Sequence, residues 1–415
     1  MRILLLIIQY PPDSNPTGML MAQVAVGLRD YGHTVDVITT FPHYAQFRIW
    51  PAYRGKLAAR ERGAAGDVLR LWVYASGAKQ RMVHRLISYL SFNALATLAG
   101  MLARQRYDVI LAPNGSFFTG IAAAVIGRLR GTPFVYNVQD LYPEVPVQAG
   151  QLTSHRAIDG LARLERLMYR LATRISVIAP AFYANLLAKG VPPAKIALIP
   201  NFVDTAFIRP LPRQNSFSQA NHLDTYFVVN YAGNLGYVYD LDTVLHAAAR
   251  LSKHPDILFQ IVGEGVSKPD LEQRASELGL TNVRFLAFQP LEQLPLMRAA
   301  ADVQLSPHRT GTTGYSLPSK IYEVMSSGRP IIVSADAGSD VATLVHQSAC
   351  GLCVPPGDPA ALAEAILTLY VDPDLRQTMG KAGRCYAEQH LSPQVIVDQY
   401  HHLLTEVVTT SSDEA

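Results

Sequence analysis

The most constraining feature of the sequence is the stretch 311–334, where a small-residue loop, a short helix and an apolar run follow one another. Pro318 presets the backbone angle of a first helical turn, and Gly328 followed by Pro330 ends the helix. The run 331–334, Ile-Ile-Val-Ser, has the apolar character of a strand that is buried on both faces. A helix leading directly into such a strand is typical of an α/β domain with a parallel sheet.

The same stretch carries polar groups suited to a nucleotide. A loop that opens a helix presents backbone N–H groups and the positive end of the helix dipole to an anion such as phosphate. Lys320 lies in the expected first turn, and Glu323 follows one turn later. The ammonium can pair with phosphate, and the carboxylate can accept hydrogen bonds from the vicinal hydroxyls of a ribose, at about 1.5–3 kcal/mol each. The alternative is an ordinary strand–loop–helix corner with a solvated glutamate.

Apolar runs alternating with helical segments divide the 415 residues into two domains. The chain opens with a strand at 2–8, a helix at 19–31 and a strand at 34–39, which is a parallel βαβ unit. After a polar, Pro-containing linker at 205–225, the pattern restarts. We expect an acceptor- or membrane-facing domain over 1–205 and a donor-binding domain over 206–390. Over 391–415 we expect a returning helix near 393–408, followed by a frayed tail at 409–415. Further strands are expected at 107–112, 134–138, 175–178, 196–199 and 282–290, and the stretch 228–236 restarts the α/β pattern.

Composition and charge exclude several protein classes. With 49% hydrophobic and 17% charged residues the chain is globular, not disordered. Three cysteines make no disulfide framework, which fits a reducing compartment. The apolar start at 1–8 lacks a cleavage site and is expected to be a strand, not a signal peptide. Residues 1–200 hold 22 Lys and Arg against 10 Asp and Glu, whereas the rest hold 14 against 23, so one half is suited to an anionic surface.

Residues 79–106 form a second informative stretch. Basic residues, including Lys79 and Arg81, precede an uncharged run over 86–103, and Arg104 follows it. The run holds too many polar residues for a membrane-spanning helix. It is suited to a helix lying at the surface of an anionic bilayer, or to a helix buried against the sheet. The long aromatic and basic loop at 40–56 is either an acceptor- or membrane-facing loop or a structural excursion.

Three segments resemble one enzyme family. Residues 316–330 resemble the signature helix of the family 4 retaining glycosyltransferases, in particular the bacterial branch that builds O-antigen, capsule or exopolysaccharide. Residues 140–144, Asp-Leu-Tyr-Pro-Glu, and 200–204, Pro-Asn-Phe-Val-Asp, resemble further segments of that family. The resemblance implies the GT-B fold: two Rossmann-like α/β domains facing a central cleft and closing over the donor, with a C-terminal helix that crosses back to the first domain.

The resemblance also implies roles for particular residues. Glu323 matches the glutamate that grips the ribose of a nucleotide diphosphate sugar, and Tyr315 occupies the position of a further glutamate. Where the family has an Arg and a Lys on the diphosphate, this chain has Asn234 and Tyr239, so Lys320 and Arg309 are expected to supply the charge. The candidate donor-binding residues are Gly18, Asn234, Phe288, Tyr315, Ser316, Leu317, Ser319, Lys320 and Glu323. The candidate catalytic residues are Asp140, Lys320 and Arg309, with a cap or loop brace as the alternative for Asp140.

No metal or other cofactor is expected, because Asp240-Leu-Asp242 opens a helix and is interpreted as a cap. We expect a retaining enzyme that moves a sugar, UDP-linked and for example an N-acetylated hexosamine, to a lipid-linked or growing polysaccharide. It is expected to be cytoplasmic and peripheral on the inner face of the plasma membrane, without a nucleic-acid partner. Two alternatives stay open: a nucleotide-sugar epimerase of similar fold, and a catalytically degenerate module that binds nucleotide sugar or membrane.

Overall fold

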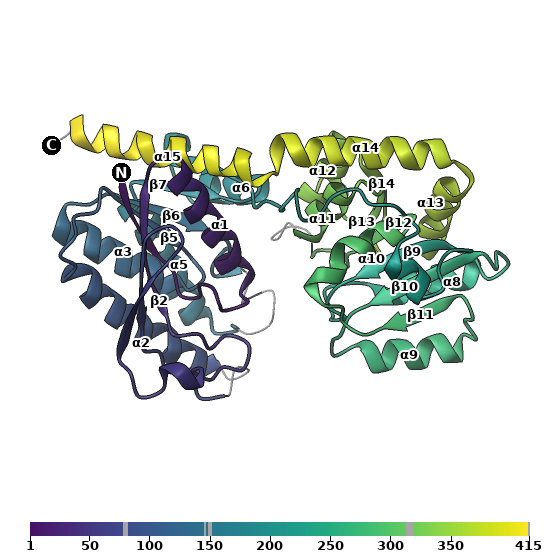
Figure 1. The fold of residues 1–415 in the computed structure, drawn as a ribbon, viewed down its shortest axis with the longest axis horizontal. Coiled ribbons are helices and arrows are strands. Elements are labelled where there is room, and N and C mark those ends of the chain that lie inside the picture. The colour runs from purple at the N-terminus through teal and green to yellow at the C-terminus, as the bar shows by residue number, and fades with distance from the viewer. Residues whose placement is uncertain (78–81, 145–146, 148–151, 313–318, 414–415) are drawn as a thin grey trace. The chain divides into compact units, whose positions relative to one another are not determined.

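The chain folds into two compact units (Figure 1). A computed structural model describes residues 1–77, 82–144, 147, 152–312 and 319–413. The first unit comprises Met1–Asn201 together with Pro393–Ala415, and the second comprises Phe202–Ser392. The C-terminal helix therefore belongs to the same unit as the N-terminal strand.

The first unit is built on an eight-stranded sheet in the order β3-β4-β2-β1-β5-β6-β7-β8. All neighbours pair in parallel except β3 and β4, which are antiparallel. Apolar side chains fill β1, β5 and β6, which are buried along their whole or nearly whole length because helices cover both faces. The strands are β1 (Arg2–Leu6), β2 (Thr34–Thr40), β3 (Ala58–Arg62), β4 (Asp67–Leu71), β5 (Val109–Pro113), β6 (Phe134–Val138), β7 (Arg174–Val177) and β8 (Ile196–Leu198).

The helices of the first unit include the last one of the chain, α15 (Pro393–Asp413), which lies against α1 (Figure 1). Tyr31 donates a hydrogen bond to Asp398 (3.0 Å), and Asn137 of β6 donates one to the buried Tyr400 (3.1 Å). The expected return of the C-terminal helix is confirmed. The other helices are α1 (Pro16–Asp30), α2 (Met82–Met101), α3 (Phe117–Arg130), α5 (His155–Leu171) and α6 (Pro180–Ala188), with short 3-10 turns η1 (Pro51–Tyr53) and η2 (Pro193–Lys195).

The second unit is built on a six-stranded parallel sheet in the order β11-β10-β9-β12-β13-β14. The order reverses beside β9, which is where open α/β sheets bind ligands. The strands are β9 (Phe227–Ala232), β10 (Ile257–Val262), β11 (Val283–Leu286), β12 (Val303–Pro307), β13 (Ile331–Ser334) and β14 (Gly351–Val354).

Helices cover both faces of this second sheet. Successive residues of a strand point to opposite sides, so neighbouring residues of β13 pack against different helices. Ile332 packs in one core with α8 (Leu241–Arg250), α9 (Lys268–Glu277) and α13 (Pro359–Val371). Ile331 and Val333 pack in the other core with α11 (Ser319–Ser327), α12 (Asp340–Ser348) and α14 (Pro373–His390). The remaining elements of the unit are α7 (Ser216–Ala220), η3 (Leu291–Gln293) and α10 (Leu294–Ala300). The doubly wound α/β architecture is confirmed in both units.

Several local predictions were wrong. The first helix begins at Pro16 instead of residue 19, because Asn15 caps it, so Gly18 is helical. The expected linker 205–225 contains α7, held by a reciprocal cap between Asn215 and Ser218. The tail after residue 408 continues α15 as far as Asp413. The hairpin of β3 and β4 was not anticipated. Lys79 and Arg81 lie outside the described residues.

Candidate functional site

The second unit contains a cavity of about 510 Å³ at the carboxyl ends of β9 and β10, the expected place for a ligand in a parallel sheet. Its lining combines polar residues with an apolar wall. The polar residues are Asn234, Glu264, Gln289, Arg298, Lys320 and Glu323, and the apolar ones are Ala232, Val262, Phe288, Leu291, Leu294 and Met297, with Gly233 between the two sets.

Glycines allow close packing at and beside this cavity, whose lining includes Gly233. A Cβ on Gly233 would lie 1.8 Å from Nζ of Lys320, so only a glycine lets that ammonium approach the backbone. A Cβ on Gly263 would lie 1.9 Å from the carbonyl oxygen of Gly233, and one on Gly265 would lie 2.3 Å from that of Leu235. The loops that follow β9 and β10 therefore pack backbone against backbone, which holds the cavity open beside them.

Lys320, in the first turn of α11, is held by two aromatic rings. Its Nζ lies 4.1 Å from the ring centre of Tyr239 and 5.1 Å from that of Tyr231, distances at which a cation is attracted to the ring face. Burial, followed by the positive charge of Arg298, lowers the pKa of Lys320 to about 8, although Glu323 opposes the shift. The groups nearest to the Lys320 ammonium therefore do not neutralise its charge completely, and a bound anion would do so.

Glu323 is held by a chain of buried polar groups. Nη2 of Arg298 lies 2.8 Å from Oε2 of Glu323, and Nη1 of Arg298 donates to Oε1 of Gln304 at 2.9 Å. Gln304 also accepts from Nδ2 of Asn230 (2.8 Å) on the neighbouring strand. The side chain of Arg298 is 3% exposed, whereas that of Glu323 is 27% exposed. This network fixes one carboxylate oxygen, and within the described residues no partner is found for Oε1, which can accept from a ligand.

The structure brings Asn234, Phe288, Lys320 and Glu323 together around the cavity. Phe288 is 71% exposed, so its ring is available to a flat ligand. Ser319 begins α11 but does not line the cavity. Tyr315, Ser316 and Leu317 lie outside the described residues.

Arg309, the second expected cation, is also not among the described lining residues. Its Nη2 lies 3.9 Å from a carboxylate oxygen of Asp242, and its side chain is 45% exposed. The cation that accompanies Lys320 at the cavity is Arg298.

Asp240 and Asp242 have structural partners. Asp240 caps α8 by accepting from the N–H and the hydroxyl of Thr243, as the sequence predicts. Asp242 pairs with Arg274 at 2.7 Å. Across the described residues, no group of three or more His, Cys, Asp and Glu side chains is arranged to hold a metal ion.

Asp140 lies in the first unit, directly after β6. Asn114 accepts from its backbone N–H (3.2 Å) and donates to its carbonyl (2.7 Å), so the backbone is braced while the side chain is exposed. No hydrogen bond to the carboxylate is found within the described residues. Although the carboxylate is open to solvent, desolvation by the surrounding protein raises the pKa of Asp140. An unpaired carboxylate with a raised pKa after a parallel strand is a candidate functional group.

The neighbouring Glu144 has a structural role. Its Oε1 lies 2.7 Å from Nζ of Lys189, which also pairs with the buried Glu165 at 2.6 Å. Gly18 lies in the first turn of α1, where its N–H donates to Asn15 (3.1 Å) and a Cβ would lie 2.5 Å from the carbonyl oxygen of Gln9. Close packing of α1 on the segment after β1 therefore requires this glycine.

The sequence reading missed Arg298, Tyr231 and Gln304. They come from α10, β9 and β12, and none belongs to a motif in its own segment. An arginine in an otherwise apolar helical segment, Leu-Pro-Leu-Met-Arg-Ala-Ala, and a polar residue in an apolar strand are the available signals, because polar groups need partners when they are buried.

Two family models cover most of the chain. One described as "Glycosyl transferase 4-like domain" matches residues 18–201, and one described as "Glycosyl transferases group 1" matches residues 212–385. The chain belongs to the family 4 glycosyltransferases. A "Putative colanic acid biosynthesis glycosyl transferase WcaI" from Escherichia coli is 26% identical over 409 residues, covering 96% of this chain and 98% of that protein. A "Probable glycosyltransferase WbjE" from Pseudomonas aeruginosa is 26% identical over 325 residues, 78% of this chain and 80% of that protein.

Solved structures agree on the fold. Anabaena HepE in complex with UDP superposes with a TM-score of 0.73 at 19% identity, over 98% of this chain and all of that one. WaaG, described as a glycosyltransferase involved in lipopolysaccharide biosynthesis, superposes with a TM-score of 0.66 at 17% identity, over 97% of this chain and 99% of that one. This family 4 glycosyltransferase therefore has the GT-B fold. None of its described helices is long and apolar enough to cross a membrane.

Proposed function

We propose that this glycosyltransferase takes a sugar from a nucleotide diphosphate sugar, which binds in the cavity of the second unit, and transfers it to a hydroxyl of a lipid-linked or growing glycan. The observation that carries the proposal is the placement of Lys320 and Glu323 one turn apart on α11, both lining the cavity beside the glycine-shaped loop at Gly233. A cation and a carboxylate at this spacing are complementary to a diphosphate and a ribose.

The diphosphate would pair with Lys320. The rings of Tyr231 and Tyr239 hold its ammonium beside Gly233, where the backbone has no side chain to exclude a ligand. As the bond to the sugar breaks, negative charge grows on the departing diphosphate, and a fixed cation there lowers the barrier. Arg309 is proposed as a second cation at the diphosphate, and this role requires that its contact with Asp242 be broken.

The nucleoside would occupy the rest of the cavity. The Oε1 atom of Glu323 is available to accept from both ribose hydroxyls while Arg298 holds Oε2. Phe288, Leu291 and Met297 offer an apolar surface to the base. The uridine base is proposed because Anabaena HepE binds UDP and resembles this chain over its whole length. The sugar, such as an N-acetylated hexosamine, and retention of its configuration rest on the family resemblance.

The acceptor is proposed to be a cell-surface glycan precursor, since the names of the relatives refer to colanic acid biosynthesis in one case and to a glycosyltransferase in the other. Asp140 is the candidate to contact the sugar or the acceptor, because its carboxylate is exposed and lacks a partner among the described residues. Gly18 stays a candidate for the donor phosphates in addition to its packing role.

Peripheral attachment to an anionic membrane, on the cytoplasmic side where nucleotide sugars are made, is proposed for α2. Val83, Leu86, Leu90 and Leu98 recur at helical spacing and are 66, 43, 47 and 52% exposed, whereas Phe92 on the same helix is fully buried. One face of α2 thus packs into the first unit and the other presents apolar side chains to its surroundings, as an interfacial helix does.

Vesicle sedimentation tests this attachment. The wild type is expected to sediment with phosphatidylglycerol vesicles more than with phosphatidylcholine vesicles, and L86E/L90E is expected to stay in solution. L278E is the matched control, since Leu278 is a 38% exposed leucine of the second unit. Equal sedimentation of L86E/L90E and the wild type would exclude α2 as the contact.

The test of the proposed function is nucleotide release. With a UDP-sugar as donor, release of UDP is expected only when an undecaprenyl-diphosphate-linked sugar or glycan acceptor is supplied. Release or sugar interconversion without acceptor would instead indicate an epimerase. Binding of nucleotide without any turnover over a panel of donors and acceptors would indicate the degenerate module.

A further inference from the structure

The cavity proposed above for the nucleotide sugar, lined by Lys320 and Glu323, is called the donor cavity. The second unit contains another cavity, of about 650 Å³, that shares no described lining residue with it. It lies where the chain leaves α11 and where α14 begins. Its lining is rich in basic side chains, namely Arg329, Arg376, Lys381 and Arg384, next to Gly328. A cavity of this volume is large enough for a small metabolite.

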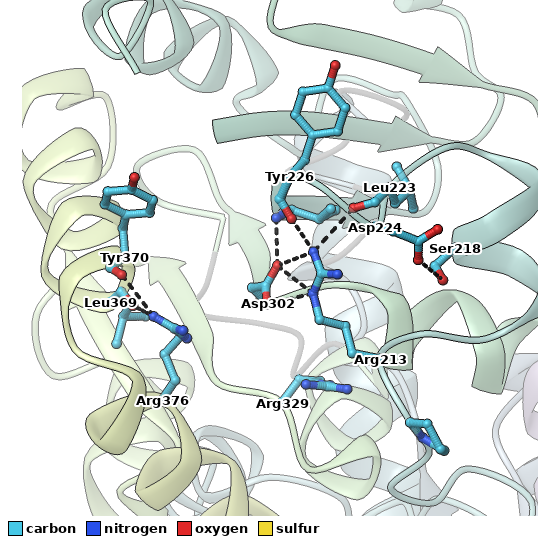
Figure 2. Close-up of polar contacts among 12 residues, drawn as sticks. Arg213, Ser218, Leu223, Asp224, Tyr226, Asp302, Arg329, Leu369, Tyr370 and Arg376 are labelled. Atoms are coloured by element: carbon cyan, nitrogen blue, oxygen red, sulfur yellow. Dashed lines mark hydrogen bonds and ion pairs between the residues drawn. The ribbon is translucent and has the colours of Figure 1, made fainter. Parts of the chain in front are cut away.

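Of the three acidic groups in the described lining of this cavity, two are already paired. Asp302 accepts from Nε and Nη2 of Arg213 at 2.8 and 2.9 Å, and also from the backbone N–H of Val228 at 2.8 Å (Figure 2). Glu388 pairs with Arg384 at 2.6 Å. Asp374 is exposed. The carboxylates of Asp302 and Glu388 therefore leave little charge to balance further cations, and only Asp374 of the three described acidic groups stays open to solvent.

Arg329, by contrast, makes no ion pair with a carboxylate among the described residues. Figure 2 shows Arg329 near Arg213 and Arg376, with the carboxylate of Asp302 bonded to Arg213 and not to Arg329. Within the described residues, the guanidinium of Arg329 makes one hydrogen bond, from Nη2 to the carbonyl of Leu211 at 3.3 Å. A guanidinium has five N–H donors, so most of its capacity is unused. Burial, and the charges of Arg213 and Arg376, lower the pKa of Arg329, while Asp302 opposes this.

The neighbouring cations Arg376 and Lys381 also have no carboxylate partner among the described residues, so they can attract an anion. Arg376 donates to the carbonyls of Leu369 and Tyr370 and lies over the ring of Phe227, with Cζ 5.1 Å from the ring centre. Its charge is thus oriented but not neutralised by a carboxylate. Lys381 is exposed at the cavity, and no hydrogen bond or ion pair of its ammonium is found in the described part of the chain.

We propose that this cavity is a second anion site that binds a phosphate group through Arg329 and Lys381, distinct from the site of the nucleotide donor. The planar guanidinium fits two phosphate oxygens at once, and the ammonium adds a third contact. The phosphate is either free or carried by a small metabolite. Arg329 follows α11, whose first turn carries Lys320, so the two sites lie toward opposite ends of one nine-residue helix.

Calorimetry on the full chain at constant ionic strength tests the site, with inorganic phosphate and glucose 6-phosphate as probes. Both are expected to bind the second cavity of the wild type and of K320M alike, because K320M removes a cation of the donor cavity and none of the second cavity. R329Q is expected to weaken phosphate binding about tenfold or more, and K381Q less. R250Q is the matched control, since Arg250 is exposed on α8 and does not line the cavity.

Thermal unfolding separates binding from folding. Without phosphate, R329Q is expected to unfold at the wild-type temperature or slightly above, because the charge it removes is opposed by two other arginines. Added phosphate is expected to raise the unfolding temperature of the wild type but not of R329Q. An equal phosphate response of both proteins, or loss of phosphate binding in K320M, would overturn the proposal. Tighter binding of the sugar phosphate than of inorganic phosphate identifies a metabolite, and the reverse identifies free phosphate.

Discussion

Donor binding should weaken as the pH rises through the pKa of Lys320. Burial and Arg298 lower this pKa to about 8, so the unliganded protein loses the ammonium proton at a pH where an exposed lysine keeps it. A bound diphosphate favours the protonated form and raises the pKa again. Binding above pH 8 must therefore take up a proton, which costs free energy.

The magnitude follows from the titration of one group. With a pKa of about 8, the protonated fraction of Lys320 falls from about nine-tenths at pH 7 to about one-tenth at pH 9. The dissociation constant for UDP should accordingly rise about tenfold over this range. At pH 8, binding should take up about half a proton.

Calorimetry at several pH values measures both quantities, because the enthalpy in buffers of different ionisation heat reports the proton uptake. K320R is the matched variant, since arginine stays charged throughout. The affinity of K320R for UDP should change with pH only as far as the ionisation of the nucleotide itself requires. A wild type that follows K320R from pH 7 to 9, with no proton uptake, would refute the assignment of Lys320 to the diphosphate.

Three further substitutions test the account. G233A should weaken nucleotide binding about tenfold, judged by calorimetry, because its Cβ would lie 1.8 Å from Nζ of Lys320 and displace that flexible ammonium. R298M should lower the free energy of unfolding by about 2–3 kcal/mol in urea titrations, since it leaves Glu323 without its partner; the partial exposure of Glu323 keeps the loss below that of a fully buried pair. D140N should reduce transfer on the order of 100-fold in the nucleotide-release assay and leave the dissociation constant for UDP unchanged.

Two of these substitutions have a control that the chain itself offers. G160A adds a Cβ to a helix position with nothing within 4 Å, and should bind like the wild type. R250M removes an exposed arginine of α8 and should unfold like the wild type. Normal binding by G233A, normal stability of R298M, or a parallel loss of binding and transfer in D140N would each contradict the corresponding role.

Strands and fold class could be predicted because they depend on local pattern. The apolar run 134–138 coincides with β6, and 331–334 coincides with β13. Element ends were less predictable, since they depend on single contacts. Asn15 starts α1 early by accepting the N–H of Gly18, and Asn215 nucleates α7 in a segment whose polar composition indicates only a linker.

The candidate site was predictable in part for the same reason. Lys320 and Glu323 are one turn apart in a single helix, so their common face follows from helical spacing. Arg298 is 25 residues from Glu323 in the chain, and only tertiary packing brings the two into contact. The rings of Tyr231 and Tyr239 around Lys320 likewise come from different segments.

The most direct test of the donor site is calorimetric titration of UDP, GDP and ADP into the wild type and into E323Q. We predict that one of the three nucleotides binds and that this nucleotide is UDP. E323Q should weaken its binding by about 1.5–3 kcal/mol, on the order of 10- to 150-fold in the dissociation constant, because a charged acceptor of the ribose hydroxyls is lost. Absence of binding by all three nucleotides, or equal affinity of E323Q and the wild type, would contradict a donor site at this cavity.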